Sequence, residues 1–317
     1  MAELTDLALS EIVDAVTAKS VAAPHHSVAV RALQPARYGG LALRDDEFIS
    51  LVCELAARDA SHGWLTATFN AASYEVAGLP DSTADEVWNA DPHALVATSY
   101  RAEGAFIRDR RLTGRWESVV GAEYADWLLL SADNGGACRV LVPRSGVRVD
   151  PVRRLTGLSA AGSSDVTASE LIVDERHIFR NHRDRIAVIA GAGIAAAVVG
   201  SADGVWRKHV DQVRARLAIS YGGEQVTDEA SAQVARAASD VDAAKLQITT
   251  SCELPAATWA FQQAIARARD SADRLLGSSR HALDASDPVT SQWKDVHAGC
   301  RLAVHHLDGL GFGGSTP

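Results

Sequence analysis

Three histidines near the C-terminus carry the side chain best suited to move protons at neutral pH. They are His297, His305 and His306. On a helix, residues three and four apart share a face, so His305 and His306 lie one turn beyond Leu302, and His297 lies one to two turns before it. Their side chains make these histidines candidates for acid–base chemistry. The alternative is that these histidines line the helix end and contact solvent.

A second set of residues has the types that a flat, phosphate-bearing cofactor such as a flavin needs. Such a site combines an apolar wall with hydrogen-bond donors for the polar edge and a turn of small residues for the phosphate. Trp116 offers the wall, and Thr98 and Ser99 offer donors, as does the turn Gly277-Ser278-Ser279. The alternative for Trp116 is a core aromatic on a strand.

Composition narrows the class of protein. The chain has 317 residues, of which 47% are hydrophobic and 22% charged, enough for two or three packed subdomains. The net charge of −9 argues against nucleic acid as the main partner. Four cysteines without CxxC spacing, and an acidic N-terminus without a signal-peptide pattern, indicate a cytoplasmic protein. The apolar run 186–200 is too short and too rich in Gly and Ala to span a membrane. We predict no metal site. The histidine pairs His25-His26 and His305-His306 have no carboxylate or cysteine beside them at the spacing of metal ligands.

The order of local patterns indicates an α+β protein. Helical periodicity fills residues 1–93, for example at Phe48, Leu51 and Leu55. Short β-prone runs separated by turn residues fill 94–182 and predict a modest β-sandwich or barrel. Long Ala-rich helical periods fill 183–317 and predict packed antiparallel helices. The predicted strands include 94–100, 105–107, 127–131, 139–143 and 170–173.

One segment imitates a dinucleotide-binding fingerprint. Residues 186–196 contain Gly-x-Gly-x-x-Ala, and Asp211 stands twenty residues after Gly191. That fingerprint requires the acid at the end of a second strand in a βαβ unit, whereas Asp211 lies in a basic, helical segment. We therefore interpret 186–196 as the start of a helix with a small-residue face.

Several motifs in order over almost the whole chain resemble one family. The glycine-tryptophan segment 114–127 is similar to the Gly-x-Trp, Ser-Gly, Ala-Asp-Trp strand and turn of the reductase-dependent, two-component flavin monooxygenases, a branch of the acyl-CoA dehydrogenase superfamily. The other matching segments are 35–40, 59–64, 157–166, 276–279 and 293–298.

The resemblance implies an acyl-CoA dehydrogenase-like fold with an N-terminal helical domain, a central β domain and a C-terminal four-helix bundle. It implies reduced FMN or FAD supplied by a separate NAD(P)H flavin reductase, a small aromatic or polyketide-like substrate, and a homotetramer whose sites span two subunits. It places flavin against Trp116, Val120, Ser163 and the turn at Gly277, Ser278 and Ser279. It also makes His297, with His305 as a substitute, the expected acid–base group.

Three positions depart from the family pattern. Val120 stands in place of a Ser, Leu302 in place of a His, and Lys294 in place of an Arg. Neither Val nor Leu can donate a hydrogen bond, and Lys lacks the bidentate guanidinium. An alternative is therefore a member without flavin redox chemistry, such as a cyclase, a dehydratase or a non-catalytic partner subunit. A dehydrogenase reaction is disfavoured, because the chain contains no Glu after Asp295 to act as the base.

Overall fold

The computed structural model describes residues 11, 13–14, 27–152, 156–180, 184–220, 225–252, 257–277 and 286–312. Within them, helices come first, strands follow, and helices return, which confirms the predicted α+β class. The helices are α2 (Asp45–Arg58), α3 (Ala60–Ala77), α4 (Asp81–Trp88), α5 (Asp184–Ile219), α6 (Asp228–Ser251), α7 (Ala257–Gly277) and α8 (Pro288–Leu307).

The strands form one connected mixed sheet rather than two separate ones. Its order is β6-β7-β3-β2-β4-β5-β8, with β1 also paired to β4. β1 and β2 run parallel to β4, and the remaining pairs are antiparallel. The strands are β1 (Val96–Ser99), β2 (Phe106–Arg108), β3 (Arg111–Val119), β4 (Trp127–Asp133), β5 (Ala137–Pro143), β6 (Arg148–Pro151), β7 (Ser164–Ile172) and β8 (Ile178–Arg180).

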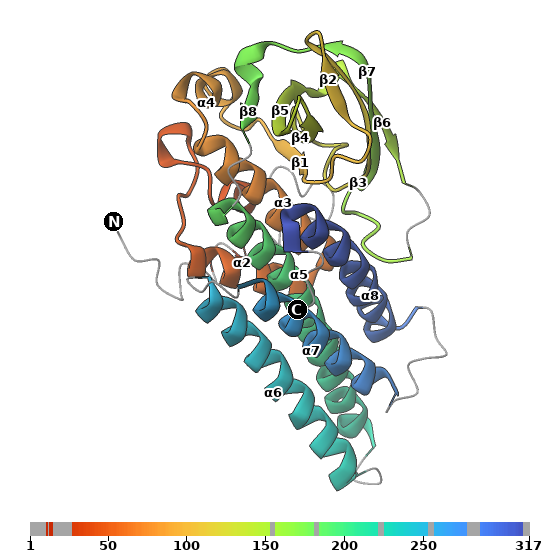
Figure 1. The fold of residues 1–317 in the computed structure, drawn as a ribbon. Helices are drawn as coiled ribbons and strands as arrows, with labels where there is room; N and C mark the ends of the chain where they lie inside the picture. The colour runs from red at the N-terminus through yellow and green to blue at the C-terminus, as the bar shows by residue number, and fades with distance from the viewer. Residues whose placement is uncertain are drawn as a thin grey trace.

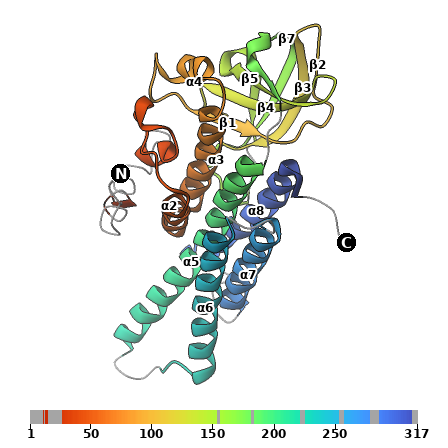
Figure 2. The ribbon, with the colours of Figure 1, turned by 60° about the vertical axis from the view of Figure 1, so that its left-hand side comes forward.

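The sheet lies at one end of the helical part of the molecule (Figures 1 and 2). α3 runs up to the sheet, and the C-terminal end of α8 meets it near β3 (Figure 1). The far ends of α5 and α6 point away from the sheet in both views. α3 is buried on every side, as expected for a helix that packs between the sheet and the other helices. The junction of α3, α8 and β3 is thus the meeting point of the two layers.

Small residues let α5 pack closely against α2, as predicted for the Gly/Ala-rich segment 186–196, where a Cβ at Gly193 would lie 3.0 Å from Phe48 Cζ. The close packing continues beyond that segment. A side chain at Gly200 would overlap the backbone of Cys53, and one at Gly204 would overlap the carbonyl of Ala57. The segment is a continuous helix without a following strand. The dinucleotide-binding interpretation is therefore excluded, and the small residues serve helix packing.

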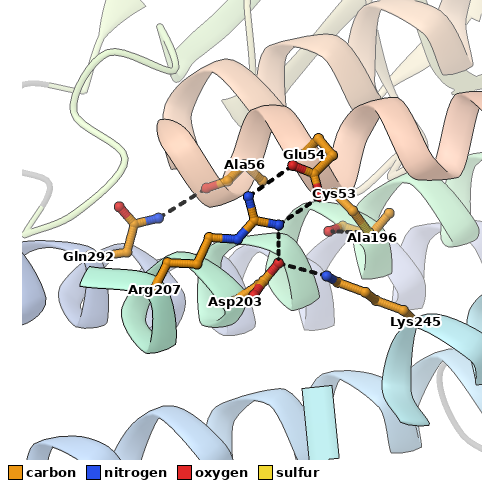
Figure 3. Close-up of polar contacts among 8 residues, drawn as sticks. All are labelled: Cys53, Glu54, Ala56, Ala196, Asp203, Arg207, Lys245 and Gln292. Carbon is orange, nitrogen blue, oxygen red and sulfur yellow. Dashed lines mark hydrogen bonds and ion pairs between the residues drawn. The ribbon is translucent and has the colours of Figure 1, made fainter. Parts of the chain in front are cut away.

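A network of charges ties α5 to its neighbours (Figure 3). The Arg207 guanidinium donates to both carboxylate oxygens of Glu54 on α2, at 2.9 and 2.6 Å. It also donates to Asp203 one turn earlier, at 2.7 Å, and Lys245 on α6 donates to the same carboxylate at 2.6 Å. Gln292 on α8 donates to the Ala56 carbonyl at 3.0 Å. The charged groups join α2, α5 and α6, and the separate Gln292 hydrogen bond joins α8 to α2.

The stretch Arg185–Ile219 is long and apolar enough, by length and composition alone, to cross a membrane. Its most apolar window is 89% buried by the rest of the molecule. Such burial is what the central helix of a packed bundle shows.

Candidate functional site

Two of the motif segments meet at the end of the sheet. Val119 on β3 pairs with Ser164 on β7. Just beyond that pair, the Gly121 N–H donates to the Ala161 carbonyl at 3.1 Å. Gly121 has a φ of +77°, and a Cβ there would lie 2.6 Å from Phe69 Cζ on α3. Only glycine combines this left-handed backbone with so close an approach to α3, so the β3 turn rests directly on that helix.

The loop before β7 is tied to α8, which carries the third motif. The Leu158 N–H donates to Asp295 Oδ1 at 2.7 Å across 137 residues of sequence. A Cβ at Gly157 would lie 2.6 Å from the Lys294 carbonyl, so the loop lies against the helix. Burial raises the pKa of Asp295, although the hydrogen bond from Leu158 opposes this effect. The three motifs thus form one structural unit.

Buried polar atoms gather around this unit. Ser163 and Ser164 are buried, and within the described residues their hydroxyl oxygens have no hydrogen-bond partner. An unpaired buried hydroxyl is costly, so such groups are usually completed by a ligand or water. The Ser163 hydroxyl therefore fits the sequence prediction that this turn holds part of a cofactor.

His305 lies at the same junction, with its ring engaged. The Arg101 guanidinium, which also pairs with Glu103, lies 2.9 Å from His305 Nδ1. Because arginine is only a donor, Nδ1 accepts and the imidazole is neutral. Burial, and then the Arg101 charge, hold the pKa of His305 below its ordinary value, while a hydrogen bond with the Glu117 backbone raises it. Arg101 must move before His305 can exchange a proton through Nδ1.

His297 lies elsewhere on α8. Its Nε2 is 2.7 Å from Asp273 Oδ1 on α7, and its ring contacts Trp293 at a centroid distance of 4.3 Å. Trp293 donates to the same carboxylate oxygen at 2.7 Å. The structure thus joins His297 to α7 and does not bring it to the β3 turn within one chain.

The three residues predicted to form the wall and donors on the strands are buried in the sheet. Trp116 is 2% exposed, and its indole N–H donates to the Ser131 carbonyl at 2.9 Å. The Thr98 hydroxyl donates to the Leu129 carbonyl at 3.0 Å. The Ser99 carbonyl accepts from Arg139. In this structure these groups already have protein partners.

The remaining predicted residues divide between the junction and the far end of the bundle. Val120 is buried beside the β3 turn, and Leu302 is half-buried against the core. Gly277 is exposed where α7 ends, away from the sheet (Figure 2). Ser278 and Ser279 lie outside the described residues. The histidine pair His25 and His26 also lies outside them.

A buried ion pair between Arg139 and Glu75 was not predicted from the sequence. Arg139 on β5 donates to the two carboxylate oxygens of Glu75 on α3, at 2.7 and 3.0 Å. Its other hydrogen bonds go to Thr98, Ser99, Leu129 and Ser131, and its guanidinium lies 4.7 Å from the centre of the Tyr100 ring. A lone arginine in the apolar run Ala137–Pro143 was the available signal.

Among the described residues, the helical part of the molecule has cavities at three places. One, of about 210 Å³, lies between α7 and α8 and is lined by residues including Ile265, Cys300 and Leu307. One of about 290 Å³ lies between α5 and α6, and one of about 420 Å³ lies between α2 and the end of α6. No residue predicted for the cofactor lines any of these three, so the candidate site rests on the contacts described above.

Comparison with known proteins finds that the chain is similar to flavin-dependent enzymes. No protein-family model matches it. It is 27% identical to the oxygenase subunit HsaA of a flavin-dependent monooxygenase from Mycobacterium tuberculosis, over 84% of this chain and 79% of the relative. It is 25% identical to the oxygenase component of an FADH₂-dependent resorcinol hydroxylase from a Rhizobium species, over 88% of this chain and 82% of the relative.

Solved structures agree on the fold. The crystal structure of HsaA matches with a TM-score of 0.78 and 24% identity, over 93% of this chain and 90% of that one. Butyryl-CoA dehydrogenase from Megasphaera elsdenii matches with a TM-score of 0.77 and 14% identity, over 98% and 99% of the two chains. The chain therefore has the acyl-CoA dehydrogenase fold, and its sequence is similar to those of oxygenase components of flavin-dependent monooxygenases.

Proposed function

We propose that this chain is the oxygenase component of a two-component monooxygenase that hydroxylates a small aromatic substrate with reduced flavin and oxygen. The convergence of the three motifs is the observation that carries the proposal: Gly121 bonds to Ala161, and Leu158 bonds to Asp295. The relatives named as flavin-dependent monooxygenase and resorcinol hydroxylase components support it. Nothing in these likenesses favours a member without flavin chemistry.

The chain's own residues suggest how the cofactor is held. Reduced flavin, when bound, would supply electrons and activate oxygen. The turn with Ser163 and Ser164 would hydrogen-bond it through hydroxyls that lack partners among the described residues. Leu65 and Phe69 on α3 pack against the neighbouring turn at Gly121. Val120 offers an apolar contact, and we assign it no hydrogen bond.

His305 would keep a neutral ring at the junction. Arg101 and the Glu117 backbone fix its orientation, and its lowered pKa keeps the imidazole uncharged at neutral pH. A fixed neutral imidazole orients a neighbouring polar group without adding charge. We keep His297 as the second candidate acid–base group. Because it lies on the surface formed by α7 and α8, this role requires that a ligand or a partner subunit approaches that surface.

The finer assignments follow from the same proposal. The words "oxygenase subunit" and "oxygenase component" in the names of the relatives suggest a separate NAD(P)H flavin reductase as the partner. Gly277 is the last residue of α7, and that end of the helix points away from the sheet (Figure 2), so a flavin role for it needs a second copy. This favours a homo-oligomer, with a dimer of dimers as our expectation. We place the protein in the cytoplasm, and leave FMN and FAD as equal candidates.

The proposal is tested by product formation. The purified chain, reduced FMN or FAD from an added flavin reductase, and a panel of phenols would be incubated under ¹⁸O₂. Mass spectrometry should find a product that has gained one labelled oxygen atom, and only when the chain is present. If the chain binds reduced flavin but no phenol gains label, the substrate class is wrong. If it binds no flavin, the proposal fails at its first step.

A further inference from the structure

Two buried polar side chains face each other between α3 and α8, and neither is used by the function proposed above. Trp64 is 0% exposed and His306 is 5% exposed, with ring centres 6.0 Å apart. In the part of the chain that the structure describes, Trp64 Nε1 and His306 Nε2 have no hydrogen-bond partner. Each unpaired nitrogen in such a place costs about 1–3 kcal/mol, so two of them together call for a polar group that completes both.

We propose that Trp64 and His306 form a binding subsite for the hydroxyl group of a phenolic substrate. The inference rests on the proposed function and deepens it, because it names the substrate feature that the chain recognises and the two side chains that recognise it.

The hydrogen-bonding chemistry of the two rings selects a hydroxyl. An indole N–H only donates, so its partner must accept. Burial lowers the pKa of His306 to about 4, so its ring is neutral at pH 7. A hydroxyl accepts from the indole, and it either donates to or accepts from the imidazole, so it satisfies both nitrogens in either tautomer. An apolar group satisfies neither.

The position of the pair suits a substrate beneath the proposed flavin turn. Leu65, which follows Trp64, contacts the turn at Gly121. His305, which precedes His306, joins α8 to Arg101. On α8, Gly299 stands opposite the indole nitrogen, and a Cβ there would lie 3.1 Å from Trp64 Nε1. Glycine at this position keeps a side chain of α8 away from the indole nitrogen.

Binding of phenol and of toluene, which differ by a hydroxyl in place of a methyl group, tests the subsite directly. The indole N–H signals of the seven tryptophans in the full-length chain would be followed by ¹⁵N NMR, with and without reduced flavin. Trp64→Phe keeps the ring shape, removes the donor and identifies the Trp64 signal. Trp259→Phe makes the same change at an exposed position on α7 and is the matched control.

We expect phenol to shift the Trp64 signal and to bind about 10- to 100-fold more weakly to Trp64→Phe, the range for loss of one buried hydrogen bond. Gly299→Ala, which fills the space beside the indole without removing any polar group, should weaken phenol binding as well. Trp259→Phe should bind phenol as the wild type does.

Equal binding of phenol and toluene, or unchanged phenol binding by Trp64→Phe and Gly299→Ala, would overturn the proposal and leave the two nitrogens to an internal water. Failure of the proposed function has a different signature, because it is the absence of reduced-flavin binding. Phenol binding to the flavin-free chain is measured independently of that result.

Discussion

At the scale of single residues, two neutral imidazoles, His305 and His306, lie at the junction of α3, α8 and β3. Arg101 fixes the ring of His305, and burial keeps His306 uncharged. The two rings lie edge to face with centres 6.1 Å apart, so a proton added to either would be close to the other. Both histidines are therefore suited to orient polar groups at neutral pH rather than to carry charge.

The buried His306 should make stability depend on pH. In the unfolded chain its pKa returns to about 6.5, whereas the folded value is about 4. Between these values the unfolded state binds a proton that the folded state does not, so stability falls as pH decreases from 6.5 to 4. The loss amounts to about 3 kcal/mol. Urea unfolding at a series of pH values measures it.

His306→Leu should flatten this pH profile, and His93→Asn, a change at an exposed histidine, should leave it as it is. The assignment is wrong if the profile of His306→Leu keeps the wild-type slope, since the other histidines whose pKa is lowered, His62 and His305, would then account for it.

The departures at Val120 and Leu302 should limit the efficiency of the reaction. Both side chains are apolar and neither can donate to a polar intermediate. Restoring the family pattern with Val120→Ser and Leu302→His together should raise the amount of hydroxylated product per reduced flavin consumed by at least about tenfold, given that a placed donor is worth about 100- to 1,000-fold in rate. Product and flavin oxidation are measured in the same reaction. An unchanged yield would mean that these two positions do not face the reacting groups.

At the scale of elements, the Arg139–Glu75 pair fastens the sheet to α3. Removing the guanidinium with Arg139→Met leaves the Glu75 carboxylate buried without its partner, and should cost about 3–5 kcal/mol in the free energy of unfolding. Adding Glu75→Gln should recover part of that loss. Arg115→Met, which breaks an exposed pair with Asp165, is the matched control and should cost about 1 kcal/mol or less. A similar cost for the two single variants would show that the buried pair contributes no special stability.

Helices and strands could be predicted from the sequence where a segment showed one clear pattern, either helical periodicity or a short β-prone run. Short β-prone runs located β1, β2, β4 and β5, but they missed β6 and β8 and covered only the end of β7. The Gly/Ala-rich segment 186–196 indicated a closely packed helix rather than a dinucleotide site, and the structure has a helix there. The order of the strands in the sheet could not be predicted, because pairing between strands distant in sequence leaves no local pattern. The sequence predicted a modest sandwich or barrel, and the structure adds the order in which its strands pair as one connected sheet.

The candidate site shows the same limit more sharply. Motifs that resemble the family's pattern located the segments that contain Gly121 and Ser163, and the structure brings the two segments together. They could not show that Trp116 and Thr98 bond to the sheet's own carbonyls, since those partners come from a neighbouring strand. Nor could they separate His297 from His305, because which face of α8 meets the sheet depends on the packing of the whole bundle.

At the scale of the whole molecule, the sheet and the helical bundle meet at one junction, and the three motifs lie on both sides of it. The contacts that join them come from β3, the loop before β7, α3 and α8. Gly277 lies at the opposite end of the bundle (Figure 2). A complete site in this arrangement therefore needs the junction of one chain and, by our proposal, the α7 end of another.

An anaerobic titration of the purified chain with reduced FMN and reduced FAD, followed by the flavin absorbance spectrum, tests this account most directly. We predict that at least one reduced flavin binds with a micromolar or lower dissociation constant and that its oxidised form binds more weakly. If neither flavin binds in either oxidation state, the junction of β3, α3 and α8 is not a flavin site and the account is contradicted.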